Sequence, residues 1–344
     1  MKIFLYKLSK HLGLFYVAKF LTRKRLRILC YHGFAYEDEH LFRPKLFMSP
    51  SLFEKRMNLL SKGGFSVLSL SDAMQNLTNG TLSNATVVIT IDDGWKGVDD
   101  IAMPILKQRG YQWTLYLTTY YVQNRLPVIN LIIQYFFWKT NSQNIEFGIV
   151  DEKLMDIKVS SAKELSEDQL THIIQTVESK KSVSEKLITL EALSKVLGIN
   201  LSDINKNDLF QIVDEEQVRH LHNVGVDIQL HSHRHTIGEN NELVLEREIK
   251  ENRQVISNII DKPLVHFCYP SGYYFEGCVE RLNKLGIITA TTCEPGLIKK
   301  NSNQLLLNRF LDGENISDIE FEAEIYGFAE ILRKARSYLS FESS

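Results

Sequence analysis

The stretch VVITIDDGWKG (residues 87–97) places two adjacent aspartates at the end of an apolar run. The run is typical of a buried strand, and Gly94 permits a turn directly after it. Because neighbouring side chains in a strand point to opposite faces, Asp92 and Asp93 can converge only where the strand gives way to that turn. Taken alone, the pattern is also typical of a capping turn before a helix, which should follow at residue 97.

Eight β-like runs recur along the chain, separated by helical patterns. They cover residues 27–32, 65–70, 86–92, 113–119, 226–231, 265–270, 287–292 and 305–310. Helix candidates lie between them at residues 51–62, 97–109, 241–260 and 274–285. Strands that alternate with helices indicate parallel βαβ units, so we predict an α/β fold, an irregular (β/α) barrel of seven or eight strands.

The alternation is interrupted once, from about residue 120 to residue 215. This segment contains an apolar stretch at 126–139, two charged amphipathic helices within 163–197 and a further helix at 208–223. We therefore predict a barrel domain over residues 27–344 with a largely helical insertion at about 120–215. Apolar residues at helical spacing over 317–338 predict a helix packed on the barrel wall.

A second cluster of polar residues follows a strand-like run in VDIQLHSHRHT (residues 226–236). His231 and His235 are four residues apart and would share one face of a helical turn. Imidazole is the commonest metal ligand among side chains, and two histidines with one carboxylate are typical of a catalytic zinc or similar centre. Since barrel enzymes take their catalytic residues from the carboxyl ends of strands, the Asp pair and the His pair indicate one metal centre.

Three motifs at these places resemble those of the polysaccharide deacetylase family, carbohydrate esterase family four. They are Thr90-Ile91-Asp92-Asp93-Gly94, His231-Ser232-His233-Arg234-His235 and Cys268-Tyr269-Pro270-Ser271-Gly272. The resemblance covers roughly residues 27–120 and 215–312. It implies Asp93, His231 and His235 as ligands of a divalent metal, with zinc the first candidate, and Asp92 as the general base. It also implies that the loop at Tyr269 and Ser271 meets the substrate and offers a backbone N–H group to the oxyanion.

The sequence departs from the family pattern in two respects. Cys268 stands where the family often has the arginine that pairs with the base, and we expect Arg309 to pair with Asp92 instead, because a neighbouring cation keeps a carboxylate ionised. No histidine follows His266, although the family's general acid is a late histidine. His32, at the end of the first strand-like run, is the remaining candidate for that acid. A rim salt bridge for Arg309, and a structural or substrate-binding role for His32, stay open.

The resemblance implies a metal-dependent hydrolase that removes an N-acetyl group from an amino sugar of a polysaccharide, an oligosaccharide or a lipid-linked glycan. Two alternatives stay open. One is a deformylase of a lipid-linked formamido sugar, and the other is a glycan-binding protein without catalysis.

The amino-terminal segment and the overall composition suggest where the protein works. Residues 1–26 form a basic amphipathic segment, and the first acidic residue of the chain is Glu37. Such a segment suits a helix on an anionic membrane surface, with residues 1–27 making the contact, or a helix packed on the barrel. The net charge of −2 gives no case for nucleic acid. Four cysteines without a CxxC pair favour a reducing compartment. We therefore expect a cytoplasmic protein, and the membrane alternative for the amino-terminal segment would make it peripheral on the inner face of the cytoplasmic membrane.

Overall fold

The computed structural model describes residues 2–82, 84–206 and 208–341. The chain forms two compact units. One is built from Met1–Gln123 and Val213–Ser344, and the other from Asn124–Ile212. None of the described helices combines the length and the apolar character that crossing a membrane requires.

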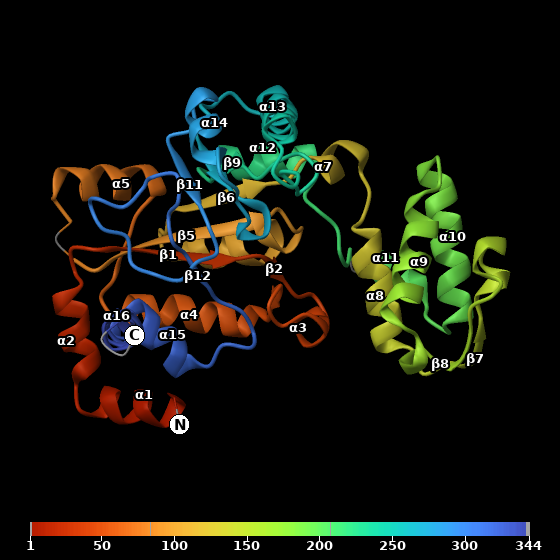
Figure 1. The fold of residues 1–344 in the computed structure, drawn as a ribbon, viewed down its shortest axis with the longest axis horizontal. Coiled ribbons are helices and arrows are strands. Elements are labelled where there is room, and N and C mark those ends of the chain that lie inside the picture. Colours follow the sequence, from red (N-terminus) through yellow and green to blue (C-terminus); the bar gives the residue numbers. More distant parts are fainter. Residues whose placement is uncertain (1, 83, 207, 342–344) are drawn as a thin grey trace. The chain divides into compact units, whose positions relative to one another are not determined.

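The first unit is organised by one curled parallel sheet, so the predicted fold class is confirmed (Figure 1). Its strands are β1 (Leu26–Tyr31), β5 (Thr86–Asp93), β6 (Trp113–Leu117), β9 (Asp227–Leu230), β10 (His266–Cys268), β11 (Thr289–Thr291) and β12 (Phe310–Leu311). Their order is β11-β10-β9-β6-β5-β1-β12, and β4 (Ser66–Val67) pairs beside β5. Every residue of β1 and β5 is buried, which explains why both strands are mostly apolar; the exceptions are Arg27 in β1 and the threonines and aspartates of β5.

The two ends of the sheet are linked by one segment that changes partner. Leu307 donates its backbone N–H to Ala290 and accepts from Thr292 beside β11, whereas Phe310 and Leu311 pair with β1. The prediction of a strand over residues 305–310 is therefore wrong in its bounds. Most of these residues cross from one edge of the sheet to the other, and only Phe310 and Leu311 form β12. The expected strand at 65–70 is also shorter, since Leu70 already begins a helix.

Helices and short strands surround this sheet (Figure 1). Those expected from the sequence appear as α4 (Pro50–Lys62), α13 (Glu242–Ile259), the shorter α14 (Cys278–Lys284), and α6 (Met103–Gln108), which follows a π-helical turn at Val98–Ala102. Others are β2 (Gly33–Phe34), α3 (Glu39–Phe42), β3 (Phe47–Met48), α5 (Leu70–Asn79), α7 (Tyr120–Asn124) and α12 (Glu215–Asn223).

The helix expected over 317–338 is two helices, α15 (Asp318–Ile325) and α16 (Phe328–Phe341). The break falls at Gly327, which has a φ of 76°. A Cβ atom there would lie 2.4 Å from the Thr22 hydroxyl, so the turn needs glycine for its backbone conformation and for its close approach. The amino-terminal segment is likewise two helices, α1 (Lys2–His11) and α2 (Leu14–Leu21), separated at Gly13 with a φ of 75°.

The second unit is mainly helical. It contains α8 (Ile129–Lys139), α9 (Glu167–Glu178), α10 (Val183–Val196) and α11 (Leu201–Lys206), together with an antiparallel hairpin of β7 (Gln143–Glu146) and β8 (Lys158–Ser161). Capping boxes begin α9 and α10. The helix expected from residue 208 starts only at Glu215, because Asp208 and Phe210 have φ values of 52° and 60°, which no helix accepts.

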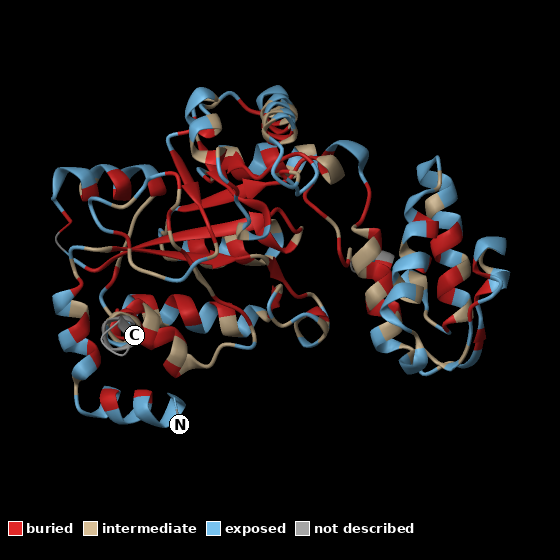
Figure 2. Ribbon diagram, in the orientation of Figure 1, coloured by how far each residue is buried: buried red, intermediate tan, exposed pale blue. Residues whose placement is uncertain are grey.

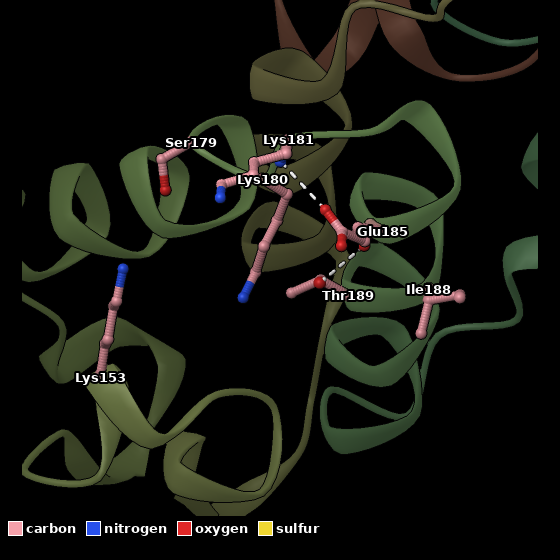
Figure 3. A pocket seen from close by; sticks show the side chains of 7 residues that line it. All are labelled: Lys153, Ser179, Lys180, Lys181, Glu185, Ile188 and Thr189. Atoms are coloured by element: carbon pink, nitrogen blue, oxygen red, sulfur yellow. Dashed lines mark hydrogen bonds between the residues drawn. The ribbon is translucent and has the colours of Figure 1, made fainter.

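A hollow of about 450 Å³ lies within the second unit (Figure 3). Its lining residues are Lys153, Ser179, Lys180, Lys181, Glu185, Ile188 and Thr189. The residues that the sequence singles out for chemistry all belong to the first unit, so this hollow takes no part in the site described next.

Candidate metal centre and catalytic site

The end of β5 turns sharply so that two neighbouring carboxylates serve one site. Asp93 has a φ of 71°, and the Gly94 N–H donates to the Asp92 carbonyl at 2.9 Å, which makes a γ-turn centred on Asp93. A non-glycine residue in this conformation carries strain of about 1–3 kcal/mol. Strand pairing of Asp93 with Leu117 of β6 holds the turn in place. The turn removes the alternation that would otherwise send the two side chains to opposite faces.

The histidine segment after β9 is a loop rather than a helical turn. Ser232 and His235 have φ values of 59° and 54°, so the expectation that helical spacing brings His231 and His235 together is wrong. The loop folds back on itself instead, and the Thr236 N–H donates to the Ser232 hydroxyl at 3.0 Å. The rings of His231 and His235 then lie 5.0 Å apart, between centroids.

Helix α13 holds this loop through two buried polar side chains. The Asn252 carboxamide oxygen accepts from the His231 N–H at 3.0 Å, and its nitrogen donates to the Leu117 carbonyl at 2.9 Å. Glu248 accepts from both the backbone N–H and the guanidinium of Arg234, at 2.7 and 2.8 Å. These hydrogen bonds stabilise the strained loop and hold His231 in a defined position relative to β6.

Three donor atoms converge beyond the γ-turn. Asp93 Oδ1 is buried and accepts no hydrogen bond from the described residues, while Nε2 of His231 and Nε2 of His235 lie 3.3 and 3.4 Å from it. The other carboxylate oxygen, Oδ2, accepts from Trp95 Nε1 at 2.9 Å. His231 donates from Nδ1 to the Cys268 carbonyl at 2.9 Å, so its Nε2 is the nitrogen left for a ligand. An orphaned buried oxygen facing two imidazoles fits a divalent metal, and this donor set suits zinc.

Asp92 lies beside this cluster and is paired with Arg309. The guanidinium donates to Oδ1 at 2.7 Å and to Oδ2 at 2.8 Å, and both side chains are at most 2% exposed. Arg309 is held in turn by Thr90 and the Thr292 carbonyl. Burial by itself would raise the pKa of Asp92, but the charge and hydrogen bonds of Arg309, together with the nearby His231 and His32, outweigh it and hold that pKa well below its ordinary value. Asp92 is therefore an ionised acceptor beside the three converging donor atoms.

Two thiols complete the surroundings of Asp92. The sulfur atoms of Cys30 and Cys268 lie 3.4 and 3.3 Å from Asp92 Oδ2. Burial raises the pKa of the Cys30 thiol well above its ordinary value, so it is a neutral neighbour. Groupings of Asp92 with these cysteines and a histidine also have ligand-like spacing. They fit a metal less well, because the guanidinium already occupies both Asp92 oxygens and would repel a second cation.

The remaining histidines separate clearly by position. His32 Nε2 is 3.9 Å from Asp92 Oδ2, and its side chain is 17% exposed, so it borders the site. His233 points away from the cluster, since its Nδ1 bonds the Thr119 hydroxyl at 2.8 Å. His266 forms side-chain hydrogen bonds with Ser71 and Thr289.

The loop after β10 is a single 3₁₀ turn, Pro270–Gly272. Ser271 has a φ of 55° there. Tyr269 is buried, its N–H donates to the Thr291 carbonyl and its hydroxyl donates to the Leu305 carbonyl, both at 3.1 Å. Both donors of Tyr269 are therefore engaged within the protein, and the structure gives it the role of holding the loop. The backbone N–H of Ser271 stays the predicted contact for an oxyanion.

Sequence reasoning missed four residues of this site. Trp95 directly follows the aspartate motif, and an indole beside a carboxylate pair was an available signal. Glu248 and Asn252 interrupt the buried stripe of α13 formed by Leu245, Ile249 and Ile256, and polar residues on an apolar stripe are a signal as well. Cys30 gave none, because a buried cysteine in a strand is ordinary.

Comparison with known proteins agrees with this geometry. The family model for polysaccharide deacetylase matches residues 79–290, which is more than half of the chain. No curated protein sequence matches. Among solved structures, the Streptococcus pyogenes deacetylase PplD in complex with acetate is 16% identical with a TM-score of 0.57, over 88% of this chain and 98% of that one. A Bacillus cereus polysaccharide deacetylase is 16% identical with a TM-score of 0.54, over 88% and 69%.

A third similar structure is a de-N-acetylase from Aggregatibacter actinomycetemcomitans, 15% identical with a TM-score of 0.52, over 87% of this chain and 98% of that one. At these identities the structural likeness concerns the fold. The family assignment comes from the family model, whose matched residues include Asp92, Asp93, His231, His235 and Cys268. This chain is a member of the polysaccharide deacetylase family.

Proposed function

We propose that this protein is a metal-dependent N-deacetylase that removes an acetyl group from an amino sugar of a polysaccharide, an oligosaccharide or a lipid-linked glycan. The observation that carries the proposal is the convergence of Asp93 Oδ1, His231 Nε2 and His235 Nε2 next to an ionised Asp92. The membership in the deacetylase family and the similarity to a de-N-acetylase and to a deacetylase in complex with acetate support the same reaction.

Asp93, His231 and His235 would hold the metal. The ligand set of one carboxylate and two imidazoles suits zinc. When bound, such a divalent ion polarises the amide carbonyl as a Lewis acid and lowers the pKa of water. Asp92 takes a proton from the attacking water, a task for which it must stay ionised at working pH. Arg309 is a positioning residue that keeps Asp92 ionised and fixes its orientation through two hydrogen bonds.

The reaction balances with water alone. The water oxygen forms a bond to the acyl carbon, the carbon–nitrogen bond breaks, and the nitrogen leaves as an amine after it gains a proton. The backbone N–H of Ser271 is the proposed donor to the oxyanion. We assign the proton for the amine to His32, which is the one histidine outside the ligand pair that borders Asp92 among the described residues.

The test is incubation of the zinc-loaded protein with N-acetylated oligosaccharides and lipid-linked amino sugars. We expect mass loss of one acetyl unit and matched release of acetate. Asp92→Asn is the control, because it keeps the ligand set. Release of formate from a formamido sugar, without acetate from any substrate, would replace this proposal with the deformylase. Binding of glycans without release of either acid would contradict both enzymes.

A further inference from the structure

The first two helices present an apolar surface to solvent. Ten of the twenty-one exposed large apolar side chains, among the residues whose side chains are described, lie between Ile3 and Leu21. They are Ile3, Phe4, Leu5, Leu8, Leu12, Leu14, Tyr16, Val17, Phe20 and Leu21. Phe4, Phe20 and Leu21 are 72%, 62% and 64% exposed. In Figure 2, α1 and α2 are mostly pale blue, interrupted by single buried positions. Exposed apolar side chains gathered in this way on two adjoining helices mark an interaction site.

The opposite faces of the two helices are fixed to the barrel unit. Tyr6 and Phe15 are buried, and their rings lie 5.9 and 5.0 Å from that of Phe328 on α16. Lys10 pairs with Glu322 of α15 at 2.6 Å. These contacts fix the orientation of α1 and α2 on the barrel unit. The apolar side chains on their outer faces are exposed as a result. The apolar surface is a fixed part of the fold.

Basic side chains border this surface. Residues 2–27 contain no Asp or Glu. Arg23 stacks on the exposed Phe20 ring, 3.9 Å from its centroid, and Lys24 follows in an exposed position. Lys7 is exposed between Phe4 and Leu8. No salt bridge joins Lys7, Arg23 or Lys24 to an acidic group in the described part of the chain.

The basic border continues beyond α2. Lys299 and Lys300 are exposed, and the positive charges of Lys334, itself paired with Glu330 at 2.7 Å, and of Arg25 lower the pKa of Lys299. Ile298 is hydrogen-bonded to Leu26 in both directions, so the segment carrying Lys299 is tied to the start of β1.

From this combination we propose that α1 and α2 dock the protein on an anionic lipid surface, with the exposed apolar side chains in the interface and the basic side chains against the headgroups. Buried apolar area and attraction to anionic lipid are the two contributions that such helices use. A second copy of the chain fits less well. An isologous contact would place this basic border against itself, and segment 2–27 offers no acidic partner.

The docking surface and the candidate site are at opposite ends of the same strand. Helix α2 and Arg25 precede β1, whereas His32 follows it. A protein attached through α1 and α2 therefore keeps its reactive end directed away from the attached helices. The proposal is independent of the chemistry at Asp92.

The test measures binding of the full chain to phosphatidylglycerol–phosphatidylcholine vesicles by sedimentation. Removing residues 1–22 would uncover Phe328 and Tyr326, so substitutions of exposed side chains are the sharper perturbation. The apolar variant combines Phe4→Ser, Phe20→Ser and Leu21→Ser, and we expect it to lose at least tenfold in affinity. The matched control combines Ile149→Ser, Leu243→Ser and Ile288→Ser, which are exposed elsewhere, and it should bind like the parent.

A charge variant separates the two contributions. Lys7→Gln, Arg23→Gln and Lys24→Gln together should weaken binding roughly 100-fold, at about fivefold for each residue. Added salt should weaken the parent in the same direction, and vesicles of phosphatidylcholine alone should bind poorly. Activity on a short N-acetylated oligosaccharide should be equal in all variants.

Three outcomes would overturn the lipid proposal. They are no vesicle binding by the parent, an equal loss in the control variant, and concentration-dependent self-association that the apolar variant abolishes while vesicles stay unbound. Vesicle binding by a protein that deacetylates no glycan would reject the proposed function and keep the lipid proposal.

Discussion

Replacing Arg309 by methionine tests how the protein keeps a buried carboxylate ionised. The substitution removes two hydrogen bonds of 2.7 and 2.8 Å from Asp92, and it leaves that carboxylate without its cation in a site that water barely reaches. Breaking one partner of a buried ion pair costs about 3–5 kcal/mol of folding stability. We therefore expect Arg309→Met to be folded but markedly less resistant to urea than the parent.

The pH dependence gives the more specific signature. In the parent, the folded-state pKa of Asp92 lies below its ordinary value of 3.8, so the ionised form stabilises the fold above that pH and the stabilisation is lost as pH falls through the folded pKa. Without Arg309, burial raises the pKa of Asp92 instead. The acid limb of kcat/KM should move to higher pH, and the variant should lose stability relative to the parent as pH rises.

Arg56→Met is the matched control. Arg56 pairs with Asp312 at 2.9 Å, and both side chains are fully buried, so its loss should cost similar stability. Its acid limb should stay where the parent has it, because Arg56 does not contact Asp92. Metal content is measured at each pH, which separates loss of the base from loss of the metal. An acid limb that is unmoved in folded, metal-loaded Arg309→Met would refute the reasoning.

Three further predictions concern the same site. Asp93→Asn and His235→Ala should lose bound zinc, measured by elemental analysis, whereas Asp92→Asn should keep zinc and lose 10²–10⁴-fold in kcat, as expected for an acid–base residue; normal turnover would remove Asp92 from the mechanism. His32→Gln should keep zinc and fold and lose the limb of the pH–rate profile that reports a protonated acid; a persisting limb with near-normal turnover would assign the acid elsewhere. Asn252→Ala should weaken zinc binding about 10–100-fold in a chelator competition, because it frees the loop that carries the first ligand; unchanged affinity would show that the loop is held without it.

The sequence alone was sufficient to predict features that depend on neighbouring residues, such as the ends of strands and the polar residues that follow them. Two aspartates after an apolar run, and histidines after another, predict strand ends, and parallel strands bring their carboxyl ends to one edge of a sheet. That reasoning predicted an irregular (β/α) barrel, which the curled parallel sheet confirms, and the motifs alone indicated the family. The resemblance prompted the prediction that Arg309 pairs with Asp92, because Cys268 stands where the family often has an arginine and a carboxylate base needs a cation to stay ionised; a rim salt bridge was the alternative, and the structure has the pair.

The spacing of residues along the sequence did not predict the backbone conformation of the loops. His231 and His235 share a site through a loop with positive φ values, although their spacing suggested a helical turn. The same limit appears at Gly327, where a close approach to Thr22 divides a predicted helix in two. Contacts with residues that are distant in the sequence select these conformations. A local sequence pattern carries no information about such contacts.

The sequence by itself determined which residues can react and roughly where the strands that carry them end, because residue type and hydrophobic period are local properties. Only the tertiary structure decided which nitrogen of His231 faces Asp93, which polar residues of α13 hold the histidine loop, and which apolar residues of α1 and α2 remain outside. These outcomes depend on how segments far apart in the chain pack: Asn252 on α13 accepts a hydrogen bond from the His231 N–H, and Phe328 covers Tyr6 and Phe15 but leaves Phe4 and Phe20 in solvent.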